Sequence, residues 1–164
     1  MPELQLRPMT DGEFVTYRDR LIREYAHEHV QAGNWTAEEA EAKSAAQVDE
    51  LLPEGLATPD MLLSIAESAE PGRVGERVGL LWLALRRSPD GSLASAWIYD
   101  IEVDAEHRGG GYGRALLAAA EEELRHRGAP AVGLNVFGHN EVALRLYASS
   151  GYRVTSQQML KELG

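Results

Sequence analysis

The sequence lacks cysteine altogether, since none of its 164 residues is one. Disulfides and zinc-thiolate sites are therefore excluded, and so is any mechanism that holds a transferred group on a cysteine thiolate. Long apolar runs are missing too, because the longest, VGLLWLAL at residues 78–85, is too short to cross a bilayer. The opening MPELQLRPM also lacks the basic and apolar regions of a secretory signal. We therefore expect a cytoplasmic protein without a membrane partner.

Positively charged residues are scarce. The chain has 16 Lys and Arg against 26 Asp and Glu, which gives a formal net charge of −10. The basic residues are spread along the chain, whereas a nucleic-acid surface needs them clustered, so no nucleic-acid partner is expected. An acidic field raises the local concentration of a cationic partner such as an amine, although the same charge also serves solubility.

With 44% hydrophobic and 26% charged residues, the composition is that of a folded globular protein. We expect a single domain over residues 1–164, of the α+β class. In the second half of the chain, the order strand, helix, strand, helix predicts one parallel strand pair. The segments with strand-like patterns are residues 3–9, 61–68, 76–85, 93–104, 131–137 and 152–163.

Helix signals separate these segments. Two capping boxes, Thr-x-x-Glu from residue 10 and from residue 36, predict the starts of two helices. A third helix is expected over residues 113–127, where apolar side chains recur at helical spacing. Asn140 is the expected N-cap of a fourth helix.

Glycines dominate the stretch HRGGGYGR, where they fill four of the five positions 109–113 just before the third helix. The first N–H groups of a helix have no partner within the helix and point toward the same place, and glycines leave that place free of side chains. A phosphate can bind there. A flexible turn without a ligand is the alternative. A nucleotide P-loop needs a lysine where Arg114 stands, and a dinucleotide fingerprint needs a small residue where Arg114 or Leu116 stands. The loop therefore predicts a phosphate ligand that neither pattern describes well.

Two motifs resemble the signature segments of the GCN5-related N-acetyltransferase (GNAT) family. Arg108, Gly111 and Gly113 fit the pyrophosphate-loop pattern of that family. The segment IEVDAEHRGGGYGRALL at residues 101–117 resembles its central strand, loop and helix, and NEVALRLYASSGYRV at residues 140–154 resembles its second signature. The earlier part of the chain matches the family only in the order of its elements.

The resemblance implies a central, mixed, mostly antiparallel twisted sheet of about six to seven strands flanked by helices. Two parallel strands in such a sheet splay apart and hold the arm of coenzyme A (CoA). The implied acyl donor is acetyl-CoA, and no metal is implied. By the same resemblance, the residues that bind the donor are Ile101, Val103, Arg108, Gly109, Gly110, Gly111, Tyr112, Gly113, Arg114 and Asn140.

Acyl transfer to an amine needs a base and an acid. An alkyl amine with a pKa of about 10 must lose a proton before it attacks, and the departing thiolate must gain one. Tyr147 matches the usual general acid of the family, although ordinary helix packing is the alternative. Glu102 is our candidate base because it lies on the strand just before the loop, and Asp100, on the same face, is the alternative. Either carboxylate instead suits a bond to a backbone N–H or to an arginine.

The resemblance thus implies an N-acetyltransferase that acts on a primary amine of a small molecule, a peptide or a protein, as a monomer or a homodimer. A CoA-binding sensor that does no chemistry is the second hypothesis. The spacing of His27 and His29 does not favour a metal pair, because two residues apart on a helix they point to different sides. His107, His126 and His139 lie at loop or helix ends, so we expect them to be solvated.

Overall fold

The computed structural model describes residues 1–164 and contains one five-stranded sheet of order β1-β2-β3-β4-β5. The strands are β1 (Leu4–Pro8), β2 (Met61–Ser68), β3 (Arg77–Arg87), β4 (Leu93–Val103) and β5 (Val132–Leu134). Neighbours from β1 to β4 pair antiparallel, whereas β4 and β5 are parallel. The predicted α+β class, with a mixed and mostly antiparallel sheet, is confirmed.

The helices lie between β1 and β2 and after β4 in the sequence, and the expected caps are formed. The α-helices are α1 (Asp11–Gln31), α2 (Ala37–Leu51), α3 (Tyr112–His126) and α4 (Glu141–Ser149), and the short 3-10 helices are η1 (Gly55–Ala57) and η2 (Ala105–His107). Both predicted capping boxes are present, and the Asn140 side chain accepts from the N–H of Ala143. None of the helices has the length and apolar character that a membrane span needs.

Two compact units make up the chain, Met1–Leu134 and Asn135–Gly164. The first unit contains the sheet with α1, α2 and α3, and the second contains α4 and the residues that follow it.

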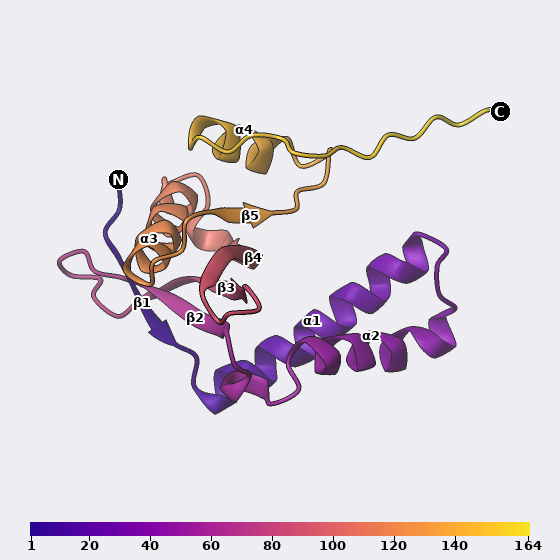
Figure 1. Cartoon of the computed structure of the whole chain (residues 1–164), viewed down its shortest axis with the longest axis horizontal. Coiled ribbons are helices and arrows are strands. Elements are labelled where there is room, and N and C mark those ends of the chain that lie inside the picture. The colour runs from indigo at the N-terminus through magenta and orange to yellow at the C-terminus, as the bar shows by residue number, and fades with distance from the viewer. The chain divides into compact units, whose positions relative to one another are not determined.

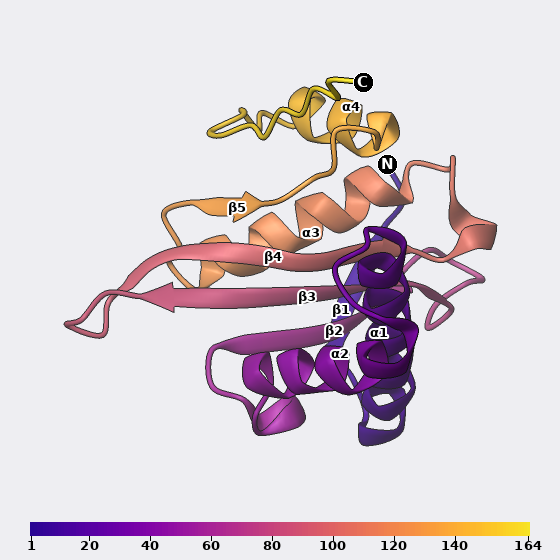
Figure 2. The same cartoon turned by 90° about the vertical axis from the view of Figure 1, so that its right-hand side faces the viewer.

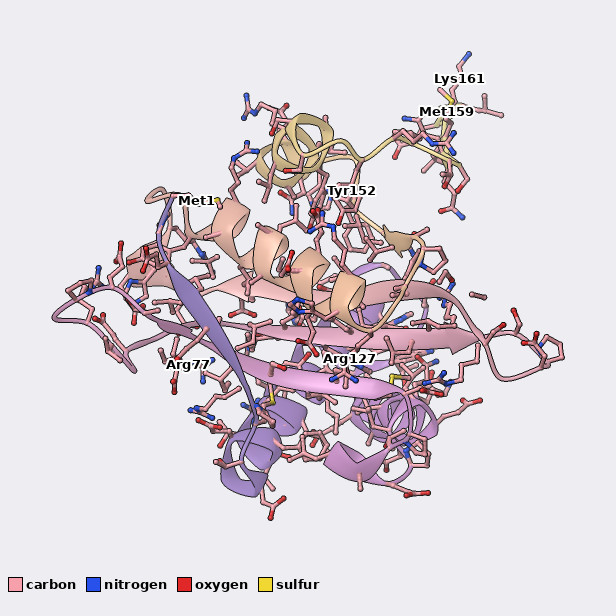
Figure 3. The ribbon with its side chains drawn as sticks, turned by 60° about the vertical axis from the view of Figure 1, so that its left-hand side comes forward. Met1, Arg77, Arg127, Tyr152, Met159 and Lys161 are labelled. Atoms are coloured by element: carbon pink, nitrogen blue, oxygen red, sulfur yellow. The ribbon has the colours of Figure 1, made fainter.

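The predicted strand over residues 152–163 is wrong, because these residues form neither helix nor strand. Met159 and Leu160 are each 91% exposed, and Figure 3 shows Met159 on this extended end of the chain. The apolar side chains of this segment are therefore not buried in the sheet. The run TSQQ before Met159 offers no apolar face. The sheet therefore has five strands, fewer than the resemblance implied.

Within the first unit, helices cover both faces of the sheet. Figure 2 shows α3 on one face and α1 with α2 on the other. Helices α1 and α2 run side by side (Figure 1), and the buried Ser44 hydroxyl of α2 donates to the Ile22 carbonyl of α1 at 2.8 Å. The predicted apolar stripe of α3 is buried, at Leu116, Leu117, Ala120 and Leu124. The core on the α1 face consists of Met9, Tyr17, Leu52, Leu63, Ile65, Leu80 and Trp82.

The backbones of β3 and β4 approach so closely at Gly79 that there is no room for a side chain. A Cβ atom at this position would collide with the carbonyl oxygen of Glu102 on β4. A strand glycine commonly marks such a close approach of two backbones. Gly79 thus fixes the spacing of β3 against the end of β4.

Gly79→Ala is expected to lower the free energy of unfolding by about 1–3 kcal/mol, because the new methyl group must push β4 away. Chemical denaturation measures the change. Gly12→Ala is the matched control, since Gly12 has nothing within 4 Å of the new Cβ and alanine is the better helix former by about 1 kcal/mol. Equal stabilities of the Gly79 variant and the native protein would contradict the close approach.

Candidate active site

An extra residue in β4 sets which side chains face α1. Trp82 of β3 lies opposite Asp100, while the next β3 residue lies opposite Ile98, so Tyr99 is bulged out of the pairing. Side chains alternate along a strand, and without the bulge Asp100 would share the α3 face with Ile98. The bulge instead brings Asp100, and Glu102 two residues later, to the α1 face.

Asp100 meets a tyrosine of α1. The Tyr17 hydroxyl donates a hydrogen bond to Asp100 Oδ2 at 2.8 Å, and the Tyr17 residue is only 5% exposed. Burial raises the pKa of Asp100, and the hydrogen bond from Tyr17 opposes part of that rise. Burial also raises the pKa of Tyr17, and the negative charge of Asp100 adds to that effect. The hydroxyl therefore stays protonated and Asp100 is the acceptor.

Glu102 meets an arginine one turn further along α1. Arg20 Nη1 donates to both carboxylate oxygens of Glu102, at 2.8 and 3.1 Å. The same nitrogen lies 3.5 Å from Oε1 of Glu24, so Arg20 has a second carboxylate within reach. Of the roles considered for Glu102, pairing with an arginine is therefore present in the structure.

A groove of about 300 Å³ adjoins these pairs. Tyr17 and Arg20 form part of its wall, together with Ile65, Leu80 and Arg77. Figure 3 shows Arg77 at the start of β3, where its guanidinium pairs with Asp104 at 3.0 Å. The groove is thus lined by apolar residues of the sheet, by arginines that already have carboxylate partners, and by α1 residues that include Glu13 and Thr16.

The parallel pairing of β4 with β5 is short. It covers three residue pairs and ends where Ile98 lies opposite Leu134. Because β4 continues to Val103, residues 99–103 have no β5 residue beside them. The backbone edge at Ile101 and Val103 is therefore not paired with β5, as expected for the predicted splayed strands.

The glycine-rich loop, residues 109–113, leads directly into α3. Gly109 and Gly111 have φ angles of 79° and 86°, a conformation that costs glycine little and strains other residues. Gly111 is the N-cap of α3 and supplies no side-chain hydrogen bond, whereas α1, α2 and α4 all begin with a side-chain cap. The first N–H groups of α3 thus lack a capping side chain, as an anion-binding helix start requires.

Two side chains at this loop have structural roles. Arg108 Nε donates to the carbonyl of Val103 at 3.0 Å, which ties the loop back to the end of β4. Arg108 therefore braces the loop, and its predicted role in donor binding stays a prediction. The expectation that His107 is solvated is wrong, because this residue is only 7% exposed and touches the Tyr112 ring edge-on, with ring centres 5.4 Å apart.

The second unit contains Asn140 and Tyr147. Asn140 Oδ1 accepts from the Ala143 N–H at 3.1 Å, so its carbonyl oxygen caps α4 and its NH₂ group is not used by that bond. The Tyr147 ring lies against the Tyr152 ring, with centres 5.7 Å apart. The roles in donor binding and proton transfer assigned to these residues by resemblance stay predictions.

A family model described as the acetyltransferase (GNAT) family matches residues 18–152. The chain belongs to the GNAT family of acetyltransferases. The matched region of this GNAT protein includes Asp100, Glu102, the glycine-rich loop and Tyr147. The family predicted from the two motifs is confirmed, and so is the enzyme class.

Relatives of this GNAT protein agree with that assignment. The chain is 35% identical over 160 residues to the uncharacterized N-acetyltransferase YycN of Bacillus subtilis. The aligned residues cover 98% of this chain and 99% of that protein. The crystal structure of YycN has a TM-score of 0.81 to this chain, at 34% identity and 98% coverage of both. A mycothiol acetyltransferase of Thermomonospora curvata is 34% identical over 125 residues, which cover 76% of this chain and 36% of that protein.

The sequence motifs did not identify the residues that hold the two carboxylates of this GNAT protein. Tyr17 and Arg20 are three residues apart on α1, and that spacing places both on one side of the helix. Tyr17 was visible in the sequence only as part of the apolar side of α1. Arg20 is next to Leu21, a residue of that apolar side. A charged residue at the border of an apolar helix face was the one sequence signal that could have indicated a contact with the sheet.

Asp100→Asn is expected to raise the free energy of unfolding at neutral pH. Asparagine keeps an oxygen that accepts from Tyr17 but carries no charge, whereas the raised pKa of Asp100 means that folding disfavours its ionised form. The gain should be full above the folded-state pKa and vanish below the unfolded value of about 4. Denaturation at about pH 8 and about pH 3 measures it.

Asp49→Asn is the control for this test, because Asp49 is exposed and pairs with Arg18. Loss of an exposed pair costs about 0–1 kcal/mol, so no gain is expected there. A gain for Asp100→Asn of the same size at both pH values would show that charge burial is not its cause.

Proposed function

We propose that this protein moves an acetyl group from acetyl-CoA to a primary amine, by direct attack of the amine on the thioester. The observation that carries the proposal is the uncapped, glycine-lined start of α3, which directly follows the β4 end with Asp100 and Glu102. Membership of the acetyltransferase family supports acyl transfer. The absence of cysteine favours a route without an acyl-enzyme.

The glycine-rich loop suits the pyrophosphate of acetyl-CoA. Several N–H groups at the start of α3 lack a capping side chain, and each bond from them to a phosphate contributes about 1.5–3 kcal/mol. Glycines keep side chains out of the phosphate's place. When bound, acetyl-CoA supplies the activated thioester. We assign its binding to Ile101, Val103, Arg108, Gly109, Gly110, Gly111, Tyr112, Gly113, Arg114 and Asn140.

The edge of β4 beyond Ile98 suits the pantetheine arm. Residues 99–103 have no β5 residue beside them, so the backbone of Ile101 and Val103 has no strand partner on that side, and the Val103 carbonyl accepts from Arg108. Backbone N–H groups that point at a developing oxyanion stabilise acyl-transfer transition states. Strand β4 would thus supply two things to the reaction. Its edge carries backbone groups that polarise the donor's carbonyl, and its α1 face carries the two carboxylates.

Glu102 is our proposed general base. Its carboxylate is bonded to Arg20, so Arg20 must move before Glu102 accepts a proton from an amine. Glu24 offers Arg20 a second partner only 3.5 Å away, which keeps the cost of that movement small. Asp100 is the alternative base, and its raised pKa favours it, since a base works best with a pKa near the operating pH.

Tyr147 is our proposed general acid for the CoA thiolate. The assignment rests on its place in the second motif, within the matched region. A tyrosine hydroxyl has an ordinary pKa of about 10, which suits protonation of a thiolate leaving group. The acceptor is proposed only as an amine of a small molecule, a peptide or a protein. The net negative charge of the chain favours such a cation.

Calorimetric titration tests the donor, and a free-thiol assay tests the chemistry. Acetyl-CoA should bind, with NADH and ATP as controls that do not, and thiol should be released only when an amine from a test panel is added. Binding without thiol release would favour the CoA-sensor hypothesis. No binding of acetyl-CoA would refute the assignment of the loop.

Tyr147→Phe is expected to lower kcat by about 10²–10⁴-fold, the usual contribution of a general acid. The Kd for acetyl-CoA should stay unchanged, because the ring remains and only the hydroxyl is removed. Steady-state kinetics and calorimetry measure the two quantities. Tyr25→Phe, which removes the hydroxyl of a tyrosine on α1, is the control, and an unchanged kcat in Tyr147→Phe would remove Tyr147 from the mechanism.

Glu102→Gln is expected to lower kcat by about 10²–10⁴-fold and to abolish the acidic limb of the pH–rate profile. Glu24→Gln is the matched control, since it removes the other carboxylate beside Arg20 and leaves the base in place. Asp100→Asn, measured in the same assay, separates the two candidates. A normal kcat for Glu102→Gln with a large loss for Asp100→Asn would transfer the role to Asp100.

A further inference from the structure

A polar network joins the β2–β3 turn to both ends of the glycine-rich loop. Arg73 lies in this turn, residues 69–76. Its Nη2 lies 3.3 Å from Nδ1 of His107, and its Nη1 donates to the Tyr112 hydroxyl at 3.0 Å. His107 precedes the loop and Tyr112 lies within its last two residues, so one guanidinium contacts the loop on both flanks.

Two carboxylates complete this network. Arg73 donates to both oxygens of Glu76, at 2.8 and 2.9 Å. The Tyr112 hydroxyl donates to Glu70 Oε2 at 3.0 Å. A guanidinium has no acceptor, so His107 Nδ1 accepts from Arg73, and the ring proton lies on Nε2, which is 3.4 Å from Glu76 Oε1. Every polar atom of the His107 ring thus has a partner from the turn.

The turn itself is held by its own backbone. The N–H of Arg73 donates to the Glu70 carbonyl, and the N–H of Glu76 donates to the Arg73 carbonyl, both at 3.0 Å. Gly75 donates to the Ser68 carbonyl at the end of β2. Arg73 therefore projects from a fixed base, which allows it to hold another segment in place.

The glycine-rich loop needs such an external support. Four of its five residues have no side chain, so it has few side chains of its own to pack, and the bond from Arg108 to Val103 braces its start. Arg73 does not suit direct contact with a phosphate, because Glu70 and Glu76 surround it with more negative than positive charge. The network suits positioning of the loop.

We propose that Arg73 is a positioning residue for the phosphate-binding loop, acting through His107 and Tyr112. The proposal rests on the proposed binding of acetyl-CoA at residues 109–113. A guanidinium has donors in a fixed fork, so one side chain reaches His107, Tyr112 and Glu76 at once, which the single ammonium of lysine cannot do. Loss of Arg73 leaves the loop folded but no longer held in the arrangement that a phosphate requires.

The test compares a donor that carries the pyrophosphate with one that lacks it. Arg73→Met should raise the Kd for acetyl-CoA by about 10–10²-fold, which corresponds to the loss of about one hydrogen bond to a charged phosphate. Turnover of S-acetylpantetheine, which has the same thioester but no pyrophosphate, should equal that of the native protein. Arg73→Lys should recover only part of the affinity for acetyl-CoA.

Arg87→Met is the matched control, because Arg87 is also a partly exposed arginine paired with a carboxylate, Asp60. It should change neither quantity. Tyr112→Phe provides a second variant that keeps the ring and removes the hydroxyl between Arg73 and Glu70. It should raise the Kd for acetyl-CoA in the native background and add little in the Arg73→Met background.

The outcomes separate the two proposals. If the native protein binds acetyl-CoA and Arg73→Met binds it equally well, the positioning role is wrong while the proposed function stands. Equal losses with acetyl-CoA and with S-acetylpantetheine would also overturn it, since they indicate general damage. If the native protein binds no acetyl-CoA, both proposals fail together.

Discussion

Side chains alternate along a β-strand, so the residue inserted at Tyr99 determines which face of the sheet receives the next carboxylates. With the insertion, Asp100 and Glu102 meet Tyr17 and Arg20 of α1. Without it, both carboxylates would lie on the α3 face among apolar side chains, where an unpaired charge is costly. The contacts of Tyr17 and Arg20 with the two carboxylates therefore depend on the bulge. They form only when α1 packs on this face and β4 has this register.

Charged groups around this end of the sheet occur in pairs. Glu102 is held by Arg20, Asp104 by Arg77, and Glu76 by Arg73. Partly exposed pairs of this kind contribute only about 0–1 kcal/mol each to stability. Their effect is geometric, because each one joins segments that are separate in the sequence or fixes a turn beside the loop. A mutation that breaks one pair should therefore disturb the site more than the fold.

Local signals in the sequence were sufficient for most of the fold. The capping boxes, the apolar stripe of α3 and the glycine pattern report on residues that are close in the chain, and the structure contains the corresponding elements. The contacts of Arg20 with Glu102 and of Arg73 with His107 join residues 82 and 34 positions apart. No local pattern encodes such pairs, which is why Tyr17, Arg20 and Arg73 were missed and His107 was expected in solvent. The last predicted strand was wrong, because residues 152–163 pair with no other strand.

Helix α3 begins without the side-chain cap that its three counterparts have. A side-chain cap stabilises a helix by about 0.5–2 kcal/mol, and α3 lacks this stabilisation. Any ligand that prefers the folded state raises its stability by mass action. Under the proposed function, the order of the first turn of α3 is thermodynamically linked to occupancy of the loop, and the melting temperature should rise with the concentration of acetyl-CoA.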